Sequence, residues 1–202
     1  MFKRNKSYLL LTFLVLTGFG GRIHSNLLPG KERKLLIHEL KDGKKALIQN
    51  VSGLDEKQLD FRPMPTAWSI RETVYHLANC EKQLWQWNEK AMKEKTKQDG
   101  VSQLMKTGSY KLNPGLNFET HRSLSAGNSG YQNINEALDE FTSKRTSLIK
   151  FVRTTTDDIR TCTVACPLGG TDSYNLLLSS SAHTQKHINE IEAIKINPNF
   201  PK

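Results

Sequence analysis

The sequence predicts an all-α protein, a four-helix bundle with a long crossover between its second and third helices. Two observations support this fold class. Apolar residues recur at helical spacing in four separate segments of the chain. Between the second and third segments lie about 35 polar and glycine-containing residues, from Lys97 to Tyr131. A short loop would make neighbouring helices antiparallel, whereas a connection of this length lets two helices run in the same direction.

The first helix is expected from Lys31 to about Val51. Its apolar residues follow helical spacing: Leu36, Leu40, Leu47 and Val51. Small and polar residues around Gly53 are expected to end it. Pro63 and Pro65 then exclude regular helix in the segment that follows, because each proline forces the preceding residue toward extended geometry.

The second helix has the clearest start in the sequence. Ser69 and Glu72 fit a capping box, in which the hydroxyl and the carboxylate satisfy unpaired amides of the first turn. An apolar stripe follows it, and the helix is expected to extend to about Thr96. The third helix is expected from Asn135 to Arg153 and the fourth from Ser173 to Lys195.

The segment Arg160–Pro167 is expected to form a short strand or an extended loop, after which Gly169 and Gly170 turn into the fourth helix. It contains Cys162 and Cys166. These cysteines could form a disulfide if the segment is a bent loop. In a straight strand their Cα atoms would be about 13 Å apart, which is too far for a disulfide.

Residues 1–25 have the layout of a secretory signal peptide. A basic start precedes the apolar run Tyr8–Phe19, and small residues follow it. We therefore expect a secreted or periplasmic protein whose domain spans 26–202 and which does not contact the membrane after leader removal. The alternative is a membrane anchor formed by an uncleaved leader, although twelve apolar residues are few for a transmembrane helix.

The composition excludes several classes of protein. The formal charge of +9 includes four basic residues of the leader, so the remainder carries only +5. Without interleaved aromatic and basic residues, this charge does not indicate nucleic-acid binding. Three cysteines are too few for a disulfide scaffold, and 37% hydrophobic residues are too many for a disordered chain. Phosphate-binding loops and the serine-hydrolase and zinc-protease motifs are absent from the sequence.

The histidines carry the main chemical signal. His183 and His187 are four residues apart, so they lie on one face of the fourth helix and could bind the same metal ion. The small residues Ser179–Ala182 are expected to leave space beside them. The alternative is a pair of half-buried, hydrogen-bonded histidines.

A third histidine could complete this site. His76 lies beside the apolar stripe of the second helix, and a bundle can bring its face against the fourth helix. Three neutral imidazoles, from His76, His183 and His187, would hold a divalent ion such as Zn²⁺ or Ni²⁺ and leave positions open for water or substrate. His24, His38 and His121 have no evident partner in the sequence.

Several short motifs resemble the DinB-like superfamily over roughly residues 32–196. Trp68-Ser69-Ile70-Arg71-Glu72, followed by His76-Leu77, resembles the second helix of that family, and His183-x-x-x-His187 resembles the signature of its last helix. Shorter matches agree in order: Leu35, Leu36 and Leu40, then Gly53-Leu54, Arg62-Pro63 and Gly169-Gly170-Thr171.

The resemblance implies an up-down-down-up bundle and a metal site at His76, His183 and His187. Similar proteins include thiol S-transferases that use bacillithiol and related mycothiol-dependent enzymes, and others are called metal-dependent hydrolases. The expected function is therefore metal-assisted activation of water or a thiol, for hydrolysis of a small molecule or S-transfer to a small electrophile. The alternative is a non-catalytic bundle that binds metal or a partner. A homodimer is compatible with such a bundle.

Other residues near the histidines have two interpretations each. Cys80 is expected to be a buried structural cysteine, the alternative being a fourth ligand or a redox-active neighbour. Glu81 and Glu190 are expected to be surface or helix-pairing charges, the alternative being groups that orient a histidine or act as a base. Trp68 and Trp85 are expected to be packing residues, although these two and Trp87 could line a substrate pocket.

Overall fold

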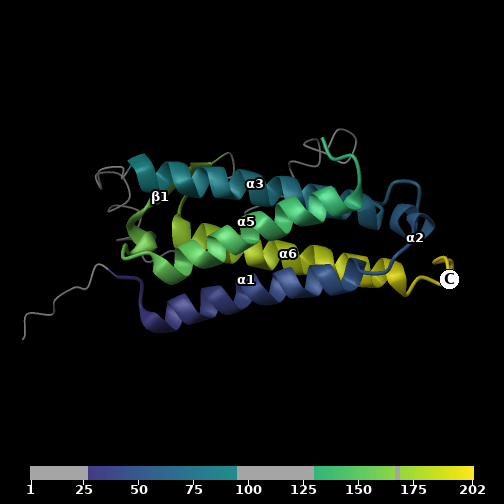
Figure 1. Cartoon of the computed structure of the whole chain (residues 1–202), viewed down its shortest axis with the longest axis horizontal. Helices are drawn as coiled ribbons and strands as arrows, with labels where there is room; N and C mark the ends of the chain where they lie inside the picture. Colours follow the sequence, from purple (N-terminus) through teal and green to yellow (C-terminus); the bar gives the residue numbers. More distant parts are fainter. Residues whose placement is uncertain (1–26, 95–129, 167–168) are drawn as a thin grey trace, which may run out of the picture.

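Four long helices form the body of the protein. The computed structural model describes residues 27–94, 130–166 and 169–202. The long helices are α1 (Gly30–Val51), α3 (Ile70–Glu94), α5 (Ile134–Thr154) and α6 (Ser173–Lys195). Figure 1 shows that α1 and α6 run in one direction and that α3 and α5 run in the other. This arrangement confirms the predicted up-down-down-up bundle.

The helices pack around the bundle in the order α1, α5, α3 and α6, since each contacts the next and α6 contacts α1. Because α3 and α5 run in the same direction, the end of α3 and the start of α5 lie at opposite ends of the bundle (Figure 1). Most of the predicted crossover falls at 95–129, outside the described residues. The parallel course of the helices on either side of it is the reason that a long connection is required.

Side chains cap the starts of the helices as their sequences indicate. The Ser69 amide donates to Glu72 Oε2 at 2.9 Å and the Glu72 amide donates to Ser69 Oγ at 3.2 Å, which completes the predicted capping box before α3. Asp172 precedes α6 and accepts a hydrogen bond from the Asn175 amide at 2.9 Å. These contacts determine where the two helices that carry the histidines begin.

Among the described residues, four short elements join the long helices. Helix α2 (Glu56–Asp60), which the sequence analysis missed, follows α1, and the 3₁₀ helix η2 (Ile159–Thr161) follows α5. Strands β1 (Thr163–Cys166) and β2 (Gly169–Asp172) then form an antiparallel hairpin that leads into α6. The hairpin confirms the strand alternative for this segment. Its extended backbone disfavours a disulfide between Cys162 and Cys166.

The apolar core consists of two clusters separated by a polar layer. One cluster, around Phe141, lies toward α2, and the other, around Leu148, lies toward the hairpin. Between them each long helix contributes one residue, and these four residues form what we call the polar layer: Gly43, Glu81, Arg145 and Thr184. The three side chains that carry polar atoms in this layer are all buried.

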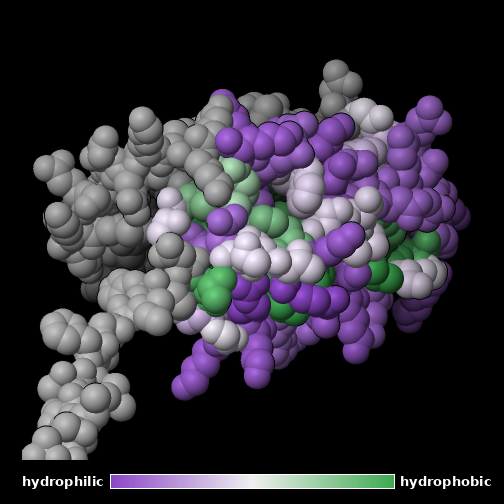
Figure 2. All heavy atoms as spheres, turned by 60° about the vertical axis from the view of Figure 1, so that its left-hand side comes forward, coloured by the Kyte–Doolittle hydropathy of each residue, from purple (hydrophilic) through white to green (hydrophobic). Residues whose placement is uncertain are grey.

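The outer surface of the described residues is mainly polar. Figure 2 shows hydrophilic side chains over most of the described surface on one face, with apolar residues in small separate groups. The exposed large apolar residues are Leu27, Leu35, Ile48, Met64 and Ile196. None of the described helices combines the length and the apolar character that a membrane span requires. The leader lies outside the described residues, so its role stays a prediction.

Candidate metal centre

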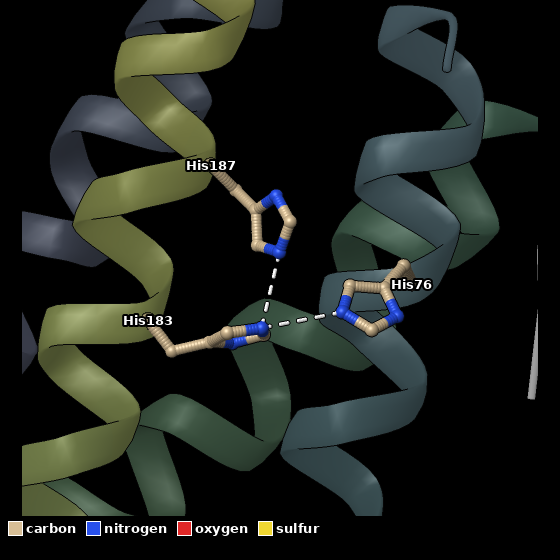
Figure 3. Close-up of side chains that lie close together, drawn as sticks. All are labelled: His76, His183 and His187. Atoms are coloured by element: carbon tan, nitrogen blue, oxygen red, sulfur yellow. Dashed lines mark hydrogen bonds between the residues drawn. The ribbon is translucent and has the colours of Figure 1, made fainter. Parts of the chain in front are cut away.

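The three predicted histidines meet between α3 and α6. His76 extends from α3, and His183 and His187 extend from successive turns of α6, so that all three rings point toward one another (Figure 3). The Nε2 atoms of His76 and His183 are 3.3 Å apart, and those of His183 and His187 are 3.0 Å apart. One ligand atom from each residue lies within 4.8 Å of the other two.

These separations suit a single metal ion. Two imidazole nitrogens bound to zinc at its usual distance and at a tetrahedral angle are about 3.3 Å apart. The two Nε2 separations that involve His183, 3.3 and 3.0 Å, are already close to this value. The donor set, three imidazoles and no carboxylate, suits zinc or nickel better than magnesium or calcium. The residues present therefore fit the divalent ion that the sequence predicts.

The environment keeps His76 and His183 neutral, as metal binding requires. Burial, together with repulsion from His187, lowers the pKa of His76 to about 4. Burial and repulsion from His187 and His76 lower the pKa of His183 to about 2, and the nearby charge of Arg145 acts in the same direction. At neutral pH both imidazoles therefore have a lone pair available for a cation.

Glu190 orients His187. Nδ1 of His187 and Oε2 of Glu190 are 2.7 Å apart, which places the proton of the neutral ring on Nδ1 and leaves Nε2 available as a ligand. The same hydrogen bond lowers the pKa of Glu190. Lys186 Nζ lies 3.9 Å from the other carboxylate oxygen. The orienting role, which was the alternative interpretation of Glu190, is therefore the one that the contacts support.

Glu81 contacts a residue of α5 inside the bundle. It is buried and forms an ion pair with Arg145, at 2.5 Å from Nε to Oε1 and 2.7 Å from Nη2 to Oε2. Arg145 Nη2 also donates to Thr184 Oγ1 at 2.8 Å. Of the expected surface or helix-pairing charge, the contacts support the helix-pairing form, because α5 covers this part of α3.

Trp68 packs directly against two of the histidines. Its ring lies nearly parallel to His187, with centroids 6.0 Å apart, and edge-on to His76, with centroids 4.9 Å apart. Trp68 is thus both a packing residue and part of the cavity wall. Trp85 and Trp87, in contrast, pack against the apolar cluster on the hairpin side of the polar layer.

Cys80 is a neighbour of the site. Its Sγ lies 3.5 Å from His76 Nε2, but the group of mutually close ligand atoms contains the histidines without it. Burial raises the pKa of the Cys80 thiol to about 12, with a contribution from the charge of Glu81. At neutral pH this cysteine is therefore a protonated, partly buried thiol, which agrees with the structural interpretation.

A cavity of about 610 Å³ opens on the three histidines. Its other walls include Trp68, Pro63 and Ile194, whereas the small residues before His183 are not among them. Ser180 and Ser181 are buried, and the hydroxyl of Ser181 donates to the backbone of α6. The expectation that these small residues leave the open space was wrong, because the rotation of α6 directs Ser180 and Ser181 into the core and leaves Ala182 exposed.

His38, the one other histidine among the described residues, does not join the site. His38 is on the exposed side of α1, where it pairs with Asp42 at 2.7 Å. His24 and His121 lie outside the described residues, as does the side chain of Cys166.

Comparison with known proteins agrees with this architecture. A sequence profile of the DinB superfamily matches residues 39–191, which include all three histidines. The chain belongs to the DinB superfamily. A solved structure, YfiT from Bacillus subtilis, is similar with a TM-score of 0.59 and 17% sequence identity, over 83% of this chain and 88% of that chain. YfiT is described as a probable metal-dependent hydrolase with an unusual four-helix bundle topology. A search of curated proteins gave no match.

Proposed function

We propose that His76, His183 and His187 bind one zinc or nickel ion and that the protein is a metal-dependent enzyme acting on a small molecule. The observation that carries this proposal is the set of three Nε2 atoms, with successive separations of 3.3 and 3.0 Å, at the wall of a cavity of about 610 Å³. Structural zinc sites close with a fourth protein ligand, whereas three ligands beside a cavity leave room for a reactant.

The bound ion would supply Lewis-acid activation of a water or a thiol. The protein's own residues prepare the site for it. Glu190 holds His187 in the correct tautomer, and burial keeps His76 and His183 unprotonated. Trp68 covers one side of the rings and limits access to the cavity side. Hydrolysis is the first activity to test, because the similar YfiT structure is described as that of a probable hydrolase.

Metal analysis of the purified protein tests the binding part of this proposal. We expect about one equivalent of zinc or nickel per chain and its loss in His183→Ala, whereas His38→Ala, an exposed replacement on α1, should retain it. Protein that remains metal-free after incubation with either ion would refute the site.

Activity assays test the catalytic part. The metal-loaded protein is assayed with ester and amide substrates and, separately, with thiol–electrophile pairs. Turnover that disappears in His183→Ala identifies the reaction class, and a loaded protein inactive with all of them would favour the non-catalytic metal-binding bundle.

We also propose export to the periplasm or cell exterior, on the basis of the leader at residues 1–25. Cell fractionation that finds the protein in the cytoplasm would contradict it.

A further inference from the structure

The cavity beside the histidines is lined in part by apolar residues. We call these five residues the apolar wall: Pro63, Ala67, Trp68, Ala193 and Ile194. They come from the segment before α3 and from the last turns of α6, so the wall joins the two helices that carry the histidines. A group bound against the wall would therefore lie next to the three Nε2 atoms.

Trp68 is the largest side chain of the apolar wall, and two ring contacts restrict its orientation. The nearly parallel contact with His187 and the edge contact with His76 hold the indole on two sides. An aromatic side chain held in this way provides a flat, rigid surface at little entropic cost when another flat group packs on it.

Among the described residues, the charged side chains that line the cavity add no net charge beside the apolar wall. The charged side chains among its described lining residues are Lys186 and Glu190, which lie 3.9 Å apart and have opposite signs. Thr73 also lines the cavity, and its hydroxyl donates to the Ser69 carbonyl at 2.9 Å. In the metal-free protein, a charged group placed on the wall would lose hydration without gaining a new ionic partner, whereas an uncharged apolar group would gain from burial.

The size of the cavity permits a ring together with a reacting group. A cavity of about 150 Å³ suffices for benzene, and this one has about 610 Å³. Sites of this size usually combine an apolar wall with a few polar or metal groups that orient the ligand.

We propose that the apolar wall binds an uncharged, flat apolar group of the substrate, stacked on Trp68 beside the bond that reacts at the three-histidine site. The substrate class is thus small molecules that carry an aryl or similarly flat group close to the reacting bond. The claim that a bond reacts at the three histidines depends on the proposed function, whereas the claim that the flat group binds depends only on the apolar wall.

Binding of three probes to the full mature chain tests this inference. The probes are 2-naphthalenemethanol, which is flat and uncharged, cyclohexylmethanol, which is apolar but not flat, and 2-naphthalenesulfonate, which is flat and charged. Calorimetric titrations are made with zinc-loaded protein and again after removal of metal by a chelator. In the metal-free protein, we expect 2-naphthalenemethanol to bind more tightly than either of the other two probes. Tighter binding of 2-naphthalenesulfonate or of cyclohexylmethanol to this form would overturn the proposal.

Variants locate the probe. Trp68→Ala should weaken binding of 2-naphthalenemethanol by about tenfold and Trp68→Phe by less, whereas Trp87→Phe, in the other apolar cluster, should leave it unchanged. Ala193→Asp provides a test that keeps the Trp68 packing, since Ala193 is an exposed member of the wall. It should also weaken binding, while Asn189→Asp, on an exposed part of α6 outside the cavity lining, should not.

The two proposals fail in different ways. Probe binding that persists in His183→Ala together with a wild-type protein that takes up no metal would refute the proposed function and leave the wall supported. Metal uptake without binding of 2-naphthalenemethanol, or probe binding that is equal in Trp68→Ala, Ala193→Asp and wild type, would overturn the inference about the wall.

Discussion

The Glu190 carboxylate lies 2.7 Å from Nδ1 of His187, on the side of the ring opposite the nitrogen that faces His183. A single carboxylate thus determines which nitrogen of His187 carries the proton and which can bind a metal. His76 has a different neighbour, the Cys80 thiol, at 3.8 Å from its Nδ1. The thiol is closer to Nε2, at 3.5 Å, so it does not select a tautomer of His76 as Glu190 does for His187.

Replacement of Glu190 should weaken metal binding without removing it. We expect Glu190→Ala to lower zinc affinity about 10–100-fold, because His187 loses the group that selects its tautomer. Glu190→Gln should lower it less, since the amide oxygen can still accept from Nδ1. Affinity is measured by competition with a chromophoric chelator. The control is Glu192→Ala, which removes a hydrogen bond to Asn50 elsewhere on α6, and zinc binding by Glu190→Ala as tight as that of this control would contradict the orienting role.

The metal-free protein should lose stability on mild acidification. The pKa values of His76 and His183 are lowered to about 4 and about 2 in the folded state, whereas an unfolded histidine titrates near 6.5. Below pH 6.5 the unfolded chain binds more protons, so the free energy of unfolding falls as pH falls, by up to about 1.4 kcal/mol per pH unit for each histidine.

Urea denaturation in the presence of a chelator, between pH 7.5 and 5, measures this dependence. His76→Gln should reduce the slope below pH 6.5, because one of the two titrating groups is removed. A slope that is the same in wild type and variant would show that other groups cause the acid sensitivity.

Breaking the buried ion pair should strongly destabilise the bundle, yet replacing both partners should not. Glu81→Gln leaves the Arg145 charge buried and incompletely paired, and we expect a loss of about 3–5 kcal/mol. In the double variant Glu81→Leu, Arg145→Met both charges are removed, and most of this loss should be recovered. Urea unfolding followed by circular dichroism compares the two, and a double variant less stable than Glu81→Gln would mean that the pair itself contributes net stability.

Replacing Gly43 with a residue that has a small side chain should increase the stability of the polar layer. A Cβ at this residue would lie 3.6 Å from Arg145 Nη1 and 3.5 Å from Thr184 Cγ2, both ordinary contact distances. Nη1 is buried and has no hydrogen-bond partner. We expect Gly43→Ala to raise the free energy of unfolding by up to about 1 kcal/mol through helix propensity.

Gly43→Ser tests the unpaired nitrogen, because its hydroxyl can reach Nη1. Serine has a lower helix propensity than alanine, so a thermal midpoint at or above that of Gly43→Ala would show that the new hydrogen bond forms. A serine variant less stable than wild type would contradict this expectation.

The four long helices could be predicted from the sequence because their signals are local. Apolar spacing and the Ser69–Glu72 box depend only on neighbouring residues, and both predicted ends of the last helix agree with α6. The five residues of α2 are too few for a periodic signal, although Asp55 and Gln58 form a capping box there. The two histidines on α6 were likewise predictable from their spacing.

The surroundings of the histidines were less predictable because they depend on how the helices are rotated and which ones are neighbours. Nothing in the sequence pairs Glu81 with Arg145, which lie 64 positions apart. Glu190 is three residues from His187, so its contact was available as an alternative, but exposed glutamates at this spacing are common. The cavity faces Trp68 and Ile194 instead of the serines because of the rotation of α6.

The order in which the metal ligands occur along the chain affects how the protein acquires its ion. His76 and His183 are 107 residues apart, and His183 and His187 belong to α6, which follows α3 and α5 along the chain. A nascent chain that lacks α6 has a single one of the three ligands, so it cannot capture an ion in the geometry of the finished site. The three-histidine site can therefore form only after α6 has been translated and has packed against α3.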